Sequence, residues 1–177
     1  AKGHSYESVV TAPTAIKDGY TTHTCVNCGD SYTDSIVPAI GIGELKISSS
    51  SVTLYNNLKV NFSVKSNLFI EDAYTNPYMV FTFGKKTMTV TDYTVVDDKY
   101  IFSCDGISPS QMGDQISVEL HAELNGQQYM KNYTYSVAKY CYDKLEENES
   151  ASLNTLLVDL LNYGAAAQTY AWYNDKT

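Results

Sequence analysis

The residues of this sequence best suited to chemistry are two cysteines separated by two residues. Cys25 and Cys28 lie in the stretch GYTTHTCVNCGDSY, which also holds His23, and His4 precedes them in the same part of the chain. Two thiolates at this spacing can bind one metal ion from a single turn, and zinc takes four ligands of these types. His4, His23, Cys25 and Cys28 together would form a Cys₂His₂ set for one structural zinc ion.

A disulfide is the main alternative to a metal ion at this turn. Cys25 and Cys28 would form one in an oxidising, extracellular compartment, and two free thiols are the third state. A catalytic redox pair is disfavoured, because a thioredoxin-type pair opens a helix, whereas Gly29 and the threonine-rich flanks indicate a β turn. Spacing alone leaves the choice open between one zinc ion and no cofactor at all.

A second group of polar and aromatic residues lies in the stretch IEDAYTNPYMVF. We expect a loop here that feeds a strand. Tyrosines beside amides and carboxylates are suited to sugar binding, and acidic loops can hold calcium. The alternative is an ordinary polar loop with a tyrosine that faces the core. The candidate binding residues are Glu71, Asp72, Tyr74, Asn76 and Tyr78.

The charge of the chain excludes two classes of partner. The net charge is -8, and all 12 basic residues are lysines, so the chain lacks the arginines that read phosphate bidentately. Nucleic-acid binding depends on basic patches, and anionic membrane surfaces repel an acidic protein. The sequence has no apolar run of about 18 residues, so we expect neither nucleic-acid binding nor membrane insertion.

The remaining reactive residues do not converge on a catalytic set. The carboxylates of Asp97-Asp98 and Glu146-Glu147 lie in expected turns, and His121 falls on the polar side of an alternating strand. Cys104 and Cys141 fit small buried side chains or a disulfide. We therefore predict that the chain is not an enzyme.

Two regions of different composition and residue pattern are expected along the chain. Residues 1–42 read as a small β module of two or three short strands, and residues 43–177 as an antiparallel β-sandwich with two C-terminal helices packed on it. Residues 58–64 alternate as a half-buried strand does. Asn125-Gly126 predicts a type I′ hairpin. Helices are predicted near 136–146 and 152–172, the second with Ser150 or Ser152 as its N-cap.

Three motifs resemble modules of known proteins. Residues 3–41 carry Gly-His-x-Tyr, Cys-x-x-Cys-Gly and Val-Pro-Ala, and resemble short repeats of modular surface proteins of gut Firmicutes. They depart from those repeats at Ala15, where many have cysteine, and His23 would compensate for it as a ligand. A second motif, made of SPSQMGDQISVELHAELNG and YTYSVAKYCYDKL, and a third, LVDLLNYGAAAQTY, resemble an accessory module of the same proteins.

This resemblance implies an extracellular or cell-surface location in a gut bacterium and a modular parent protein. We therefore expect a non-catalytic accessory or spacer module whose partners are the other domains of the same surface protein. The alternative is an adhesion module that binds glycan or host protein through its tyrosines and the 70–78 loop.

Overall fold

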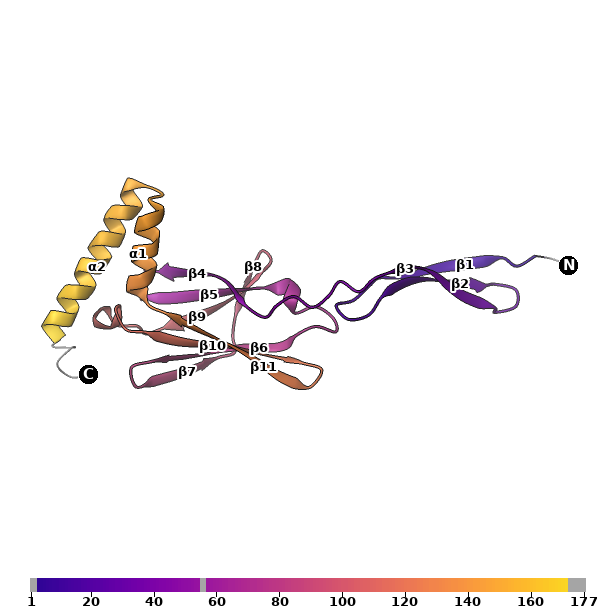
Figure 1. The fold of residues 1–177 in the computed structure, drawn as a ribbon, viewed down its shortest axis with the longest axis horizontal. Helices are drawn as coiled ribbons and strands as arrows, with labels where there is room; N and C mark the ends of the chain where they lie inside the picture. The colour runs from indigo at the N-terminus through magenta and orange to yellow at the C-terminus, as the bar shows by residue number, and fades with distance from the viewer. Residues whose placement is uncertain (1–2, 55–56, 172–177) are drawn as a thin grey trace.

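The computed structural model describes residues 3–54 and 57–171, which form three antiparallel sheets and two C-terminal helices (Figure 1). The chain is mainly β, and the predicted combination of β-sheets with two terminal helices is confirmed. Residue 172, the last of the predicted second helix, lies outside the described residues.

The first sheet has three strands in sequence order. β1 (Tyr6–Thr11), β2 (Gly19–Cys25) and β3 (Ser31–Val37) pair antiparallel as β1-β2-β3. Side chains of β1 and β3 are exposed along their whole length, and only the ends of β2 are buried. A sheet with this little burial depends on contacts at its ends, where Cys25 and the turn before Gly19 lie.

Two four-stranded sheets form the sandwich, with strand orders β4-β5-β9-β8 and β11-β10-β6-β7. The strands of the first are β4 (Ile47–Thr53), β5 (Lys59–Lys65), β8 (Thr94–Val96) and β9 (Lys99–Asp105). Those of the second are β6 (Thr75–Phe83), β7 (Lys86–Val90), β10 (Ile116–Leu124) and β11 (Gln127–Tyr135).

Strict alternation of apolar residues places one face of each sheet in a shared core. Val60, Phe62 and Val64 on β5 are buried, as the alternation predicts. Phe62 stacks on Phe81 of the other sheet at 5.4 Å between ring centroids, which joins the two layers. Because a side chain of this size buries about 150–250 Å², such pairs dominate the energetics of the core.

The hairpin between β10 and β11 has the predicted turn. Asn125 and Gly126 both adopt positive φ, at 52° and 75°, which a type I′ turn requires. This turn sets the register Leu124↔Gln127 and therefore sends Val118 and Leu120 to the core.

Two helices follow the sandwich at the end away from the first sheet (Figure 1). α1 (Val137–Glu147) begins where Ser136 Oγ accepts a hydrogen bond from the Lys139 amide. α2 (Ala151–Ala171) begins at Ser150, whose Oγ accepts from the Leu153 amide at 3.2 Å, so Ser150 is the N-cap. α2 packs on the short 3₁₀ helix η2 (Pro109–Gln111) and on α1.

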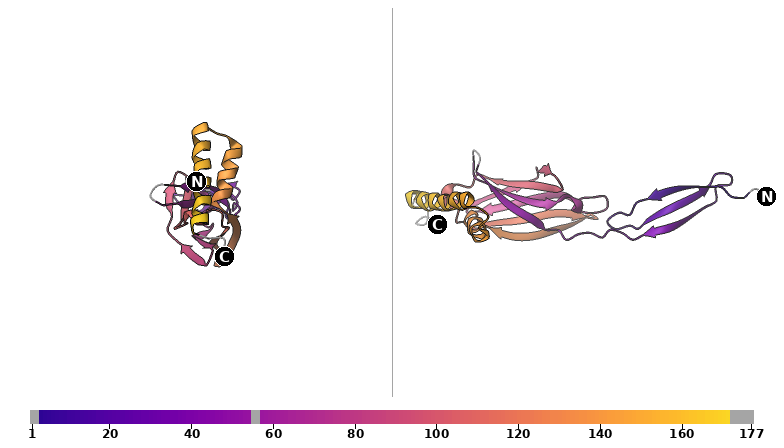
Figure 2. Two further views of the ribbon diagram at one scale, coloured as in Figure 1. Left: turned by 90° about the vertical axis from the view of Figure 1, so that its left-hand side faces the viewer. Right: turned by 90° about the horizontal axis from the view of Figure 1, so that it is seen from above.

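Figure 2 shows the three-stranded sheet and the sandwich arranged end to end rather than side by side. The connecting segment packs at both of its ends. Ile40 and Gly41 donate backbone hydrogen bonds to Thr14 and Ala15 of the β1–β2 turn. Ile42 and Leu45 pack into the core of the sandwich.

Among the described residues, no helix is both long enough and apolar enough to cross a membrane.

Candidate functional site

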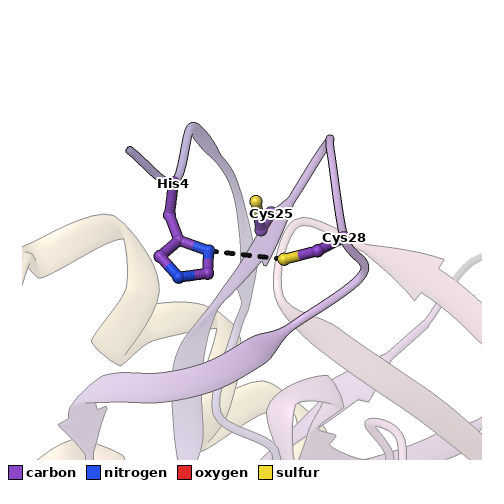
Figure 3. Close-up of side chains that lie close together, drawn as sticks. All are labelled: His4, Cys25 and Cys28. Atoms are coloured by element: carbon purple, nitrogen blue, oxygen red, sulfur yellow. Dashed lines mark hydrogen bonds between the residues drawn. The ribbon is translucent and has the colours of Figure 1, made fainter. Parts of the chain in front are cut away.

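The turn that carries the two cysteines closes the hairpin between β2 and β3. The Cys25 amide donates to the Asp30 carbonyl at 2.7 Å, and the Gly29 amide donates to the Cys25 carbonyl at 2.9 Å. Gly29 adopts φ of +74°, a conformation that residues with a side chain rarely take, so the chain reverses directly after Cys28. The turn points both sulfurs toward the same space (Figure 3).

His4 completes a group of three ligand atoms with the two cysteines. Its Nδ1 lies 3.3 Å from Cys28 Sγ, and the ligand atoms of His4, Cys25 and Cys28 all lie within 4.8 Å of one another (Figure 3). The segment holding His4 is fixed to the turn because the Val26 amide donates to the Ser5 carbonyl at 2.9 Å. The structure thus contains a group capable of binding a metal ion.

The separation between His4 and Cys28 is close to that of two ligands in a zinc site. Bonds of about 2.3 Å to sulfur and 2.0 Å to nitrogen place the ligand atoms of a tetrahedral ion about 3.6 Å apart. The observed 3.3 Å between Cys28 Sγ and His4 Nδ1 requires only a small outward shift to admit the ion. Cys25 is buried whereas Cys28 and His4 are exposed, so one side of the group faces solvent.

The turn also stabilises negative charge on sulfur, which metal binding needs. The backbone N–H of Asn27, with contributions from the His4 side chain and the Cys28 backbone, lowers the pKa of Cys25 to about 6. At Cys28 the backbone N–H of Asp30 favours the thiolate, but the neighbouring Cys25 sulfur and burial outweigh it, and the pKa is raised. One of the two sulfurs is therefore a thiolate at neutral pH, and a cation would stabilise the second.

His23 lies outside this group, although it shares a strand with Cys25. Its Nδ1 is 2.8 Å from Ser8 Oγ and its Nε2 is 2.9 Å from Asp34 Oδ1, so both ring nitrogens have partners on neighbouring strands. The ring also stacks on Tyr32, with 4.7 Å between centroids. Of the four predicted ligands, the structure brings together three.

Ala15 is buried at the opposite end of β2 from the cysteine turn. Seven residues of strand separate the two ends, or about 20 Å at 3.3 Å per residue. A cysteine at position 15 would therefore not reach Cys25 or Cys28, and His23 does not stand in for one.

Tyr6 and Asp30 support the site, and sequence reasoning did not identify them. Tyr6 donates its hydroxyl hydrogen bond to Asp30 Oδ2 at 3.0 Å, pairs with Cys25 in register, and stacks on the His4 ring. The alternation of His4 and Tyr6 two residues apart was the available signal, because it places both side chains on one face of an extended segment.

The residues of the 70–78 stretch do not form one exposed surface. Asp72 Oδ2 pairs with Lys17 Nζ at 2.8 Å, and Lys17 lowers the pKa of the Asp72 carboxyl. Tyr74 is buried, with its ring edge against Tyr129. Glu71 is exposed, and Asn76 and Tyr78 belong to β6 rather than to a loop.

Tyr78 lies on the outer face of its sheet beside His121. The two rings stack with 4.5 Å between centroids and an interplanar angle of 5°. His121 Nε2 lies 2.9 Å from Glu119 Oε2, and Met130 pairs with His121 in register. Each ring covers one face of the other, so the pair forms a stacked unit on the outer surface of the sheet.

Cys104 and Cys141 are fully buried, as expected for small apolar side chains. Burial raises the pKa of Cys104 to about 12 and also raises that of Cys141. Both are therefore thiols at neutral pH and poor nucleophiles.

No family model matches the chain, and no curated protein or solved structure matches it either. The geometry of the chain itself is therefore what supports a function.

Proposed function

We propose that this chain is a non-catalytic accessory module of a modular, extracellular bacterial surface protein, and that it acts as an elongated spacer. The observation that carries the proposal is the end-to-end arrangement of its two β units with a packed junction between them (Figure 2). The resemblance of its motifs to surface-protein repeats supports the location and the bacterial source.

Three kinds of contact stiffen the junction. Lys17 of the first sheet's turn pairs with Asp72 of the sandwich at 2.8 Å. Leu45 is buried in the sandwich core, and Ile42 packs against it. Gly43 lies so close to Leu68 that an added Cβ would come within 2.6 Å of Leu68 Cδ2. A connector packed in this way transmits orientation from one unit to the other, as a spacer must.

The main alternative, an adhesion module that uses the 70–78 loop, fits these contacts less well. Asp72 and Tyr74 are occupied by Lys17 and Tyr129 and so serve the junction and the sheet. One groove, of about 590 Å³, has mainly apolar walls, including Leu58, Ile107 and Met112. Sugar recognition instead uses exposed aromatic faces with convergent polar groups.

Backbone ¹⁵N relaxation tests the spacer. We expect amides of β2 and of β10 to fit a single, strongly anisotropic rotational diffusion tensor. Separate tumbling of the two units would contradict the proposal. A glycan array with the same protein addresses the alternative, and saturable binding to a defined glycan would favour adhesion.

We further propose that one structural zinc ion binds His4, Cys25 and Cys28. The three ligand atoms within 4.8 Å of one another carry this proposal. Support also comes from the need of a small sheet with few buried residues for a staple. Zinc bound by thiolate and imidazole would hold the β2–β3 turn against the segment before β1.

Elemental analysis with a free-thiol count tests the zinc site. We expect about one zinc per chain, loss of zinc in Cys28→Ser and His4→Ala, and retention in the matched control His23→Ala. Metal-free protein with a Cys25–Cys28 disulfide, detected by a mass lower by two hydrogens, would contradict the proposal. Retention of zinc in His4→Ala would remove His4 from the ligand set.

A further inference from the structure

Helix α2 has a wider apolar surface than its own chain covers. Leu157 and Gly164 are buried against the rest of the molecule. Beside them Leu156, Tyr163 and Tyr170 are 49%, 60% and 89% exposed. An exposed helix of a soluble domain normally carries charged residues on its outer side.

The exposed Leu156, Tyr163 and Tyr170 form a stripe with the half-buried Leu160 and Ala167, of which Leu160 also packs against the core of its own chain. Leu156, Leu160, Tyr163, Ala167 and Tyr170 follow one another at alternating steps of four and three residues. At 100° per residue this spacing holds all five within a narrow arc, and it is the spacing with which helices pack in coiled coils. The stripe therefore has the form of a helix-packing seam without a helix on it among the described residues.

The charge distribution indicates what can approach this stripe. The chain has 20 acidic and 12 basic residues, but Asp159 is the only charged residue in Ala151–Ala171. Two copies of an acidic protein repel one another over most of their surfaces. Electrostatic repulsion between two copies is smallest along α2, so α2 is the surface on which a second copy can approach most closely.

We propose that α2 packs antiparallel against α2 of a second copy of this chain, with the two helices crossing near Tyr163. In this arrangement Leu160 of one copy lies beside Ala167 of the other, a large side chain against a small one. Leu156 lies beside Tyr170, and the two Asp159 residues lie on opposite sides of the crossing point. A parallel pair would instead place the two Asp159 carboxylates together, which like-charge repulsion disfavours.

The area available is close to what a weak, specific contact needs. A buried tyrosine contributes about 150–250 Å², and since Tyr163 and Tyr170 are 60% and 89% exposed, two copies supply on the order of 450–750 Å² from these residues. Leu156 and Leu160 add to this, and a specific interface needs about 1,000 Å² in total. We expect a dissociation constant on the order of micromolar, because an interface of this size gives modest affinity.

Sedimentation velocity of the full chain over a range of concentrations tests the proposal. We expect the mass to rise from 19.6 kDa toward that of a dimer as the concentration passes through the micromolar range. Tyr163→Lys should weaken dimerisation about thirtyfold or more, because it places a charge at the centre of the contact. The matched control is Val158→Lys, which changes a 44% exposed residue on the other side of the same helix and should leave dimerisation unchanged.

Two results would overturn the proposal. One is a wild-type chain that stays monomeric at concentrations a hundredfold above the expected constant, which would leave the stripe to a different protein. The other is a dimer that survives in Tyr163→Lys or is lost equally in Val158→Lys. Far-UV circular dichroism of each variant establishes that α2 is intact, and a second variant, Leu156→Lys, gives an independent reading if Tyr163→Lys fails to fold.

Discussion

At the scale of single residues, the cysteine turn gives its two sulfurs different properties. Cys25 is buried at the end of β2 and receives backbone N–H groups, whereas Cys28 is exposed and contacts His4 at 3.3 Å. The two thiols therefore lose their protons in separate steps, with Cys25 first. This asymmetry arises from the turn rather than from the order of the residues in the chain.

We predict that metal-free, reduced protein shows one thiolate step near pH 6 in its ultraviolet absorbance, since the pKa of Cys25 is lowered to about 6. An unfolded cysteine titrates near about 8.5, so the folded state gains stability as pH rises from 6 toward that value. The gain is lost as pH falls through 6. Cys25→Ser should abolish this step, and Cys141→Ser should preserve it.

The types of residue identified the candidate site, but they could not predict which side chains each candidate ligand would contact. A metal group that includes Cys25, Cys28 and His4 was one expectation, beside a Cys25–Cys28 disulfide, and these three residues do lie together. His23 was expected to join them, yet Ser8 and Asp34 occupy its ring nitrogens. Both partners lie on adjacent strands, so their proximity depends on the register of the sheet, which spacing along one strand does not contain.

At the scale of elements, Gly164 shows how a single position fixes α2 on the sandwich. An added Cβ there would lie 3.1 Å from Met112 Sδ and 3.4 Å from the Pro109 carbonyl oxygen. The surface of α2 at Gly164 is therefore occupied by η2 and the residue after it. Tyr163 and Tyr170 remain on the open side.

We predict that Gly164→Val lowers the free energy of unfolding by about 1–3 kcal/mol, because a branched side chain overpacks the contact with Met112 and the backbone of η2. The matched control is Ala166→Val at an exposed position of the same helix. It should cost only about 0.5 kcal/mol, the difference in helix propensity. Urea denaturation followed by circular dichroism measures both, and equal effects would contradict the packing explanation.

Patterns of residues close in sequence predicted the strands, the turn and the helix cap well. They could not predict which strands pair with one another. The alternation in β5 and β10, the Asn125-Gly126 turn and the Ser150 cap are each determined by residues close in sequence. The loop expected around residues 70–78 is shorter than predicted, since β6 begins at Thr75. Pairing with Glu123 of β10 extends the strand there, and no neighbouring residue signals it.

At the scale of the whole molecule, one ion pair crosses the junction of the two β units in the described residues. Lys17 Nζ and Asp72 Oδ2 are 2.8 Å apart, and the Lys17 side chain is 68% exposed. An exposed pair contributes little to stability, but it can select one orientation of two packed units. Its role is therefore in alignment more than in resistance to unfolding.

We predict that Lys17→Ala increases the independent motion of the three-stranded sheet and leaves the unfolding midpoint nearly unchanged. ¹⁵N relaxation of β2 amides relative to β10 amides measures the first effect, and thermal unfolding measures the second. The matched control is Lys46→Ala, because Lys46 pairs with nearby Glu44 at 3.8 Å.

Since Lys17 lowers the pKa of Asp72, the same loosening of the three-stranded sheet is expected in the wild-type protein as pH falls through that lowered pKa.

The strand order of the sandwich has a consequence for how the chain acquires its structure during synthesis. β1, β2 and β3 pair with their immediate neighbours, so the first sheet can close as soon as it leaves the ribosome. β6 finds β7 at once, but its other edge stays unpaired until β10 has been made. For that interval the backbone N–H and C=O groups along one edge of β6 face water on a nascent chain, which is the period of greatest exposure to aggregation and to chaperones.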